Sequence, residues 1–133
     1  MICAIADTHA LIWYLFEDRR LSRAAKQFMD NAAKSGEEIG FSAISVVEIV
    51  YLIEKDKIKP DTLERLLKAT ETSSAALVEV PVTGRIANKM HSVSRESIPD
   101  MPDRIIAATG LDLNVPIISR DGKIKVGNLR TIW

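Results

Sequence analysis

ICAIAD, residues 2–7, is an apolar run that ends in an acid, and the same arrangement recurs along the chain. Such a run is typical of a strand buried inside a parallel sheet. The next segment, residues 11–16, is strongly apolar and fits either a strand or a short buried helix. Its position directly after a strand and an Asp-Thr pair favours the helix.

The rest of the chain alternates between short apolar runs and helical patterns. Further strands are predicted at residues 38–43, 77–80, 115–118 and 129–132. Helices are predicted at residues 22–33, 45–55, 61–67, 83–90 and 103–113, and a loop at 92–102. Strands separated by helices indicate βαβ units. We therefore predict a three-layer α/β/α fold with a mainly parallel central sheet of about five strands.

Length and composition indicate one folded domain, residues 1–133. The chain is 47% hydrophobic and 27% charged, which is ordinary for a globular protein. Its 18 basic and 18 acidic side chains give a formal net charge of zero. That balance argues against binding of nucleic acid through bulk positive charge, although it allows local basic patches.

The cellular location is predicted from the cysteine content and the apolar runs. The single cysteine, Cys3, cannot form an internal disulfide and fits a reducing cytoplasm. No signal peptide is recognisable, and no apolar run approaches the ~20 residues that a membrane span needs. We expect a cytoplasmic protein that does not enter a membrane.

Four acids stand where an apolar run gives way to a turn or a helix: Asp7, Glu48, Asp103 and Asp121. In open α/β sheets the carboxyl ends of the strands share one edge, where ligands bind. Acids at four such ends can therefore converge. Crowded carboxylates raise one another's pKa, and a hard divalent cation relieves that repulsion. The pattern indicates a divalent metal and phosphate chemistry.

Each acid also has an ordinary structural explanation. Asp7 precedes a helix and can cap it, and Asp121 begins an Asp-Gly turn. Glu48 completes a Ser-x-x-Glu capping box with Ser45. Asp103 can complement the helix dipole in a first turn. Spacing alone favours a shared site by a small margin and leaves the other explanation open.

The sequence around the acids falls into four blocks: IADTHALIW at 5–13, SAISVVEI at 42–49, DRIIAAT at 103–109 and VPIISRD at 115–121. In this order the blocks resemble PIN-domain ribonucleases, in particular the VapC-type toxins of prokaryotic toxin–antitoxin pairs. The resemblance covers essentially the full length. It shows no departure at the acidic positions, and Ser119 stands where the family often has Ser or Thr.

This resemblance implies hydrolysis of RNA phosphodiester bonds with one or two Mg²⁺ ions, for which Mn²⁺ can substitute. It implies four catalytic acids, with Asp7 and Asp103 as direct metal ligands. Glu48 and Asp121 would act through bound water or position the nucleophile.

Further residues are expected to support this chemistry. Thr8 and Ser119 can hydrogen-bond a carboxylate, a metal-bound water or a phosphate. His9 more often represents a partly exposed polar residue than a catalytic one. Basic residues near the acidic edge are candidate substrate contacts: Arg104, Arg120, Lys123 and Lys125. For each of these, a solvated or locally paired side chain explains the residue at least as well. With 5% aromatic residues, no extensive stacking platform is expected.

Partners are suggested by bulky side chains in the first helix. Trp13, Tyr14 and Phe16 cannot all point one way on a helix, so at least one is expected at the surface. Tyr51 and Leu52 can line the same region. The resemblance implies a VapB-type antitoxin whose apolar segment occupies such a groove, and it implies a homodimer.

Two other classes of protein remain open at this point. An Asp-based phosphoryl-transfer protein also places an Asp at a strand end, but the haloacid-dehalogenase-like phosphatase pattern has a second Asp where this chain has His9. A receiver domain needs paired acids, which Ala43-Ile44 does not offer. A non-catalytic RNA-binding PIN domain is the third reading. A protein that only binds RNA could lose these carboxylates without losing function, and the loss would relieve their mutual repulsion. Retention of all four acids therefore argues against this third reading.

Overall fold

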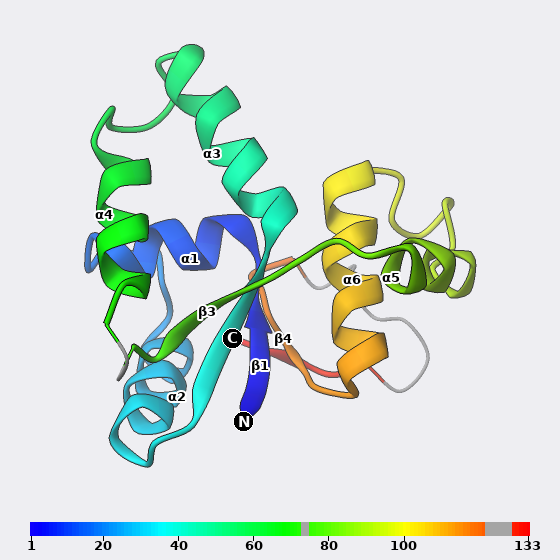
Figure 1. Ribbon diagram of the computed structural model, residues 1–133, viewed down its shortest axis with the longest axis horizontal. Helices are drawn as coiled ribbons and strands as arrows, with labels where there is room; N and C mark the ends of the chain where they lie inside the picture. Colours follow the sequence, from blue (N-terminus) through cyan, green and yellow to red (C-terminus); the bar gives the residue numbers. More distant parts are fainter. Residues whose placement is uncertain (73–74, 122–128) are drawn as a thin grey trace.

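The computed structural model describes residues 1–72, 75–121 and 129–133. Within these residues, five strands form one sheet in the order β3-β2-β1-β4-β5, and every adjacent pair is parallel (Figure 1). The strands are β1 (Ile2–Ala6), β2 (Glu38–Ser42), β3 (Leu77–Val80), β4 (Ile117–Ile118) and β5 (Thr131–Ile132). The predicted parallel α/β sheet is therefore confirmed.

Helices cover both faces of this sheet, which completes the predicted three layers (Figure 1). They are α1 (Thr8–Leu15), α2 (Arg23–Lys34), α3 (Ala43–Glu54), α4 (Thr62–Thr70), α5 (Gly84–Lys89) and α6 (Met101–Leu113), with a short 3₁₀ helix η1 (Met90–Ser92). No helix in the described part of the chain is long and apolar enough to span a membrane.

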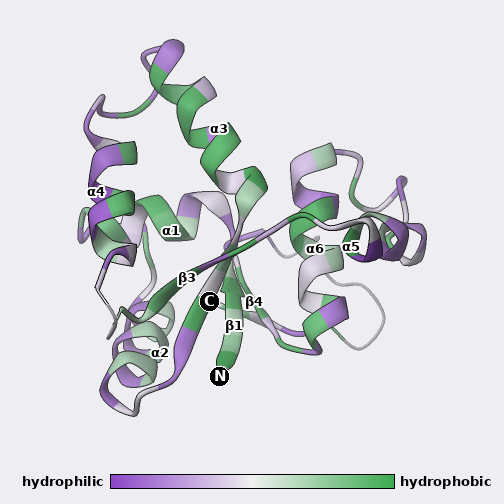
Figure 2. Cartoon of the chain, viewed as in Figure 1, coloured by the Kyte–Doolittle hydropathy of each residue, from purple (hydrophilic) through white to green (hydrophobic). Residues whose placement is uncertain are grey.

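The side chains of β1 point alternately to the two faces of the sheet and belong to two separate parts of the core. Ala4 and Ala6 pack with Leu11 and Met29 on the face covered by α1 and α2. The side chain of Ile5, which points the other way, packs with the residues of α5 and α6. Hydrophobic residues accordingly colour the strands and the inward sides of the helices in Figure 2.

Two helices begin earlier than the sequence predicts. Helix α3 begins at Ala43, because Ser42 caps it by accepting a 3.1 Å hydrogen bond from the N–H of Ile44. Helix α6 begins at Met101, because the Asp100 carboxylate accepts a 3.2 Å bond from the N–H of Asp103. The loop predicted at residues 92–102 therefore ends two residues early. Residues 11–16 belong to a helix, as the sequence favours.

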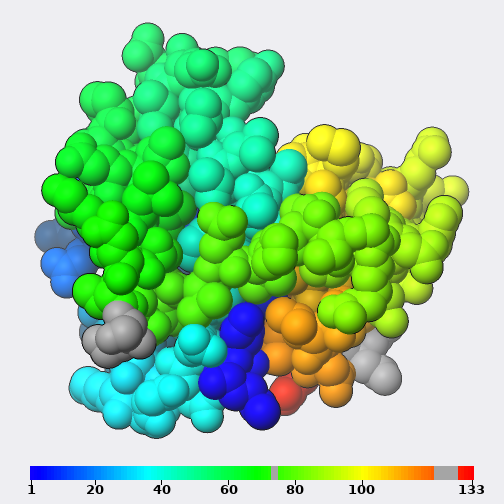
Figure 3. All heavy atoms as spheres, viewed as in Figure 1, coloured from blue at the N-terminus to red at the C-terminus, as the bar shows by residue number. Residues whose placement is uncertain are grey.

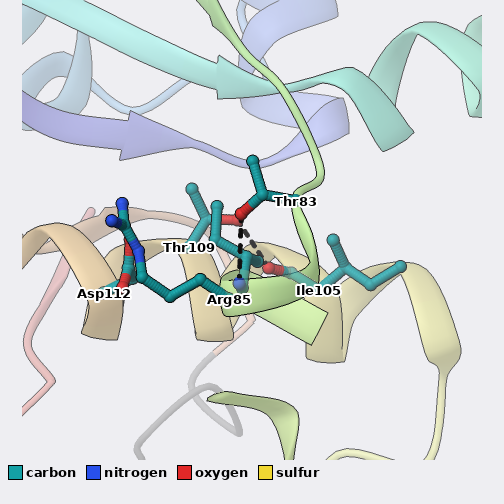
Figure 4. Close-up of polar contacts among 6 residues, drawn as sticks. Thr83, Arg85, Ile105, Thr109 and Asp112 are labelled. Carbon is teal, nitrogen blue, oxygen red and sulfur yellow. Dashed lines mark hydrogen bonds and ion pairs between the residues drawn. The ribbon is translucent and has the colours of Figure 1, made fainter. Parts of the chain in front are cut away.

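Polar contacts hold α6, the helix that carries the third acid, against α5 (Figure 4). The guanidinium of Arg85 donates to the carboxylate of Asp112 at 3.0 Å. Thr83 caps α5 at the end facing α6. The hydroxyl of Thr109 donates to the carbonyl oxygen of Ile105 at 2.7 Å within α6. The pair of Arg85 and Asp112 thus joins α5 to α6, while the bonds of Thr83 and Thr109 stabilise α5 and α6 internally.

Candidate active site

Asp7 lies at the centre of the candidate site, because it directly follows β1, the middle strand of the sheet. Its Oδ1 accepts a 2.8 Å hydrogen bond from the N–H of Ala10 and so caps α1. The residue is only 9% exposed. A carboxylate has about four acceptor positions, so capping and a role in the site are compatible.

Glu48 is held beside Asp7 by a chain of hydroxyl groups. The hydroxyl of Thr8 donates to Oε1 of Glu48 at 2.5 Å, and it lies 2.8 Å from the hydroxyl oxygen of Ser45. Ser45 is buried inside α3 rather than at its start. The capping box that was the alternative explanation for Ser45 and Glu48 does not form, since Ser42 caps the helix. The contact instead joins α1 to α3.

Asp103 faces this pair from the first turn of α6. Burial raises the pKa of its carboxyl to about 7, and the neighbouring charges of Asp100, Glu48, Asp7 and Asp121 act in the same direction. Charge interactions of this kind weaken with distance. All four predicted acids therefore share one region, together with a fifth carboxylate.

The pKa values of the two inner acids are shifted the same way. Burial raises the pKa of Asp7, against the opposing effect of hydrogen bonds from Ser119 and Ala10. Burial also raises the pKa of Glu48, against the hydrogen bond from Thr8. These two carboxyl groups hold their protons more readily than free carboxyl groups do. A bound cation that replaced the protons would offset the negative charge of the two carboxylates.

Ser119 and Asp121 complete the edge beside β4. The hydroxyl oxygen of Ser119 accepts a 3.0 Å hydrogen bond from the N–H of Asp121. The N–H of Ser119 donates to the carbonyl oxygen of Ile132 at 3.2 Å, which ties this turn to β5. Ser119 is 1% exposed, whereas Asp121 is exposed. Asp121 thus stands at the open side of the site.

Helices α3 and α6, which contact each other, flank the site. In Figure 3 the surface steps inward between the teal spheres of α3 and the yellow spheres at the start of α6. Glu48 projects from one of these helices and Asp103 from the other.

The donor set suits a hard divalent cation, because carboxylate oxygens are the ligands that Mg²⁺ and Mn²⁺ prefer. Among the described residues, no three His, Cys, Asp or Glu side chains lie close enough together to enclose an ion directly. Mg²⁺ usually keeps several waters and binds one or two carboxylates. The arrangement therefore fits a hydrated ion, with the more distant acids bound through water.

Arg104 has a structural contact that its predicted role did not include. Its guanidinium donates to the carbonyl oxygens of Met90 at 2.9 Å and Val93 at 3.1 Å. The same side chain is half-buried, and its Nε has no hydrogen-bond partner in the described structure. Arg104 thereby fastens the segment before α6 to the helix. A phosphate contact through these nitrogens would require those bonds to break.

Of the three other basic candidates, only Arg120 belongs to the residues that the structure describes. Arg120 is exposed between Ser119 and Asp121, at the open side of the site. Lys123 and Lys125 lie outside the described residues.

Two residues of the site were missed by sequence reasoning. Asp100 contributes charge at both Asp103 and Glu48, and Ser45 extends the hydroxyl chain. The signal for Asp100 was available, because an Asp two residues before Pro102 is a typical helix cap. The contact of Ser45 joins segments 37 residues apart, and no local pattern predicts it.

The aromatic side chains of α1 point in different directions, as expected. Trp13 is 7% exposed, whereas the half-buried Tyr14 donates through its hydroxyl to Asp30 at 2.8 Å. Phe16 lines a hollow of about 410 Å³, together with residues 56–59. Tyr51 is 59% exposed on α3.

The sheet order, the edge of acids and the helical cover define a PIN-type α/β domain. Residues 4–127 match the PIN domain family, so the chain belongs to that family. This membership sets aside the phosphatase and receiver readings.

Individual relatives carry more specific names. The chain is 25% identical to Ribonuclease VapC22 of Mycobacterium tuberculosis (strain ATCC 25618 / H37Rv) over 130 residues, which cover 94% of this chain and 92% of the relative. The fold is similar to that in VapBC2 from Rickettsia felis bound to a DNA fragment from its promoter, with a TM-score of 0.72, 18% identity and 98% and 97% coverage. It is also similar to a toxin–antitoxin complex from Klebsiella pneumoniae, with a TM-score of 0.68, 24% identity and 98% and 96% coverage.

Proposed function

We propose that this protein is a metal-dependent endoribonuclease toxin of the VapC type, acting in the cytoplasm and neutralised by a cognate VapB-type antitoxin. The observation that carries the proposal is the convergence of Asp7, Glu48, Asp103 and Asp121 at the carboxyl edge of the sheet. Membership of the PIN family and the ribonuclease name of a relative support it.

In this proposal Asp7 and Asp103 hold Mg²⁺ directly, with Mn²⁺ able to replace it and one or two ions bound. When present, the ion lowers the pKa of the attacking water and offsets negative charge on the phosphoryl oxygens. The two acids lie on different elements, at the end of β1 and the start of α6. The fold therefore sets the separation of the direct ligands.

Glu48 and Asp121 orient the nucleophile. Thr8 occupies one oxygen of Glu48 and leaves the other to accept a hydrogen bond from water. As the water oxygen bonds to phosphorus, the bond from phosphorus to the leaving oxygen breaks. The water's proton is released to a neighbouring acceptor, for which the raised pKa of Glu48 is suitable.

Partner binding forms the second half of the proposal. Helix α3 projects from the body of the molecule in Figure 1. Along it, Val47, Val50 and Tyr51 are 60%, 38% and 59% exposed. Their spacing places them on one side of the helix, and exposed apolar patches mark interaction sites. This surface and the hollow beside Phe16 are the candidate contacts for the antitoxin and for a second copy of the chain.

Growth of a bacterial host tests the toxin reading. Induction of the wild-type chain should arrest growth, and Asp7→Asn should relieve the arrest at equal protein level. Asp61→Asn is the matched control, because Asp61 also directly precedes a helix, α4, but its side chain is 52% exposed. Arrest that persists with Asp7→Asn would contradict the proposal. Co-expression of a cognate antitoxin should restore growth.

A further inference from the structure

Trp133 lies at the same edge of the sheet as the acids. It directly follows β5, which runs parallel to β4. The residue before it, Ile132, accepts a hydrogen bond from Ser119, which itself hydrogen-bonds Asp7. Because β1, β4 and β5 are parallel and adjacent in this order, Trp133 lies two strands away from Asp7 at the same edge of the sheet.

Three rings gather at this point. The ring centroid of Trp13 lies 5.6 Å from that of His9 and 5.8 Å from that of Trp133, the latter in an edge-to-face arrangement. Trp13 is 7% exposed, whereas Trp133 is 36% exposed and His9 is also exposed. Trp13 thus serves as the buried support, and the other two rings keep surface open to solvent.

The support is fixed by its neighbours. The guanidinium carbon of Arg20 lies 5.2 Å from the centroid of the Trp13 ring. Arg20 is itself paired with Asp18 at 2.8 Å, so it belongs to the scaffold of the ring cluster. Ring surface that is already positioned loses little conformational freedom when a ligand binds.

The ring cluster also lies within reach of the site. His9 is two residues from Asp7 in the first turn of α1, and its charge affects both Asp7 and Glu48. A nucleotide whose phosphate reached the acids would place its base close to these rings. Bases have apolar faces that stack on aromatic side chains without regard to sequence.

We propose that His9 and Trp133 form a stacking platform for an unpaired base next to the scissile phosphate. The inference rests on the nuclease function proposed above and assigns two residues outside the acidic site to binding of an RNA base. A base inside a duplex is already stacked on its neighbours and offers no free face. Two exposed rings suffice for one or two bases, which agrees with the low aromatic content of 5%.

The test uses an RNA that the wild-type protein cuts, with the base removed from one nucleotide at a time around the cleavage site. Removal of the stacked base should raise KM about tenfold or more, with a smaller change in kcat, because stacking strengthens binding about 5- to 160-fold per base. Trp133→Leu and His9→Ala should each raise KM on intact RNA and reduce the effect of base removal. Trp133→Phe, which keeps a ring, should retain most of the effect.

Leu67→Ala is the surface control, because Leu67 is 46% exposed on α4 and lies outside the ring cluster. It should leave KM and the effect of base removal unchanged. A Trp133 variant that merely loosens the fold would weaken intact and base-free substrates equally. That outcome, or equal cleavage of duplex and single-stranded RNA, would overturn the platform.

A binding measurement separates this inference from the nuclease proposal. Asp7→Asn protein, which should not cut, should show quenched tryptophan fluorescence with a short single-stranded RNA. The same backbone without bases should quench far less. Equal quenching by both would overturn the stacking platform even if the wild type cuts RNA. Base-dependent quenching by a protein that never cuts RNA would support the platform and overturn the nuclease function.

Discussion

Replacing Asp103 by Asn should stabilise the metal-free protein above pH 7 while abolishing cleavage. The pKa of Asp103 is raised from 3.8 to about 7, chiefly by burial and then by its acidic neighbours. Between these two values the folded protein keeps a proton that the unfolded chain has released. Stability due to this group therefore falls as the pH rises from about 4 to about 7. Above pH 7 the folded protein carries the full unfavourable charge.

The size of the gain follows from that shift. A rise from 3.8 to about 7 corresponds to about 4 kcal/mol at 1.36 kcal/mol for each pKa unit. Asp103 is only half-buried, and solvent screening reduces this to about 1–2 kcal/mol. Asn also loses the favourable interaction of a carboxylate with the helix dipole, about 0.5 kcal/mol. The expected net gain is about 1 kcal/mol at pH 8.

Urea denaturation at pH 8 and pH 5, in the presence of chelator, measures this difference. The gain should be full at pH 8 and reduced to about a third of that at pH 5, because at pH 5 the unfolded chain has already released the proton that folded Asp103 still keeps. Asp61→Asn removes a carboxylate at another helix N-terminus without the burial, so it should give no gain at either pH. Mg²⁺ should then stabilise the wild type more than Asp103→Asn. If Asp103→Asn were less stable than the wild type at pH 8, the reasoning that burial and neighbouring acids destabilise the Asp103 carboxylate would be refuted.

Three further substitutions test separate contacts. Thr8→Val removes the hydrogen bond to Glu48 and should lower kcat about tenfold in a cleavage assay. Thr8→Ser keeps the hydroxyl and should restore kcat. An unchanged kcat in Thr8→Val would show that the bond does not orient Glu48. Gly110→Ala should lower the free energy of unfolding by about 1–3 kcal/mol in urea, because the new Cβ would lie 2.5 Å from Cδ1 of Ile117; an unchanged midpoint would contradict this packing. Arg104→Met should lower the free energy of unfolding by about 1–3 kcal/mol, because two hydrogen bonds to the carbonyl oxygens of Met90 and Val93 are lost. It should also speed proteolysis of residues 90–100. Unaltered proteolysis would contradict the anchoring role of Arg104.

The strands and most helices could be predicted because their signals are local. The run at residues 2–6 is apolar throughout because β1 is buried on both faces, and the structure confirms it as the central strand. The starts of α3 and α6 were misplaced because two candidate caps stood close together. Ser42 and Ser45 can both cap by type, and only the backbone conformation of Ser42 decides between them.

The site was harder to predict than the fold, because its contacts join distant segments. The sequence indicates that acids follow the strands, but not that Thr8 reaches Glu48 across 40 residues. It also does not reveal that Arg104 turns toward the segment before α6. Successive side chains on a helix point in directions about 100° apart. The segment that the guanidinium of Arg104 contacts therefore depends on how α6 packs, which the sequence alone does not show. The ring cluster around Trp13 likewise needed β5 in place.

Cleavage of a panel of structured RNAs by purified protein tests the central claim most directly. The reactions contain Mg²⁺, Mn²⁺ or chelator, and Asp7→Asn and Asp103→Asn protein are run beside the wild type. The four-acid site predicts cutting at defined positions that requires the metal and vanishes in both variants. Cutting that persists in chelator or in the two variants, or folded wild-type protein that cuts no RNA in either metal, would contradict it.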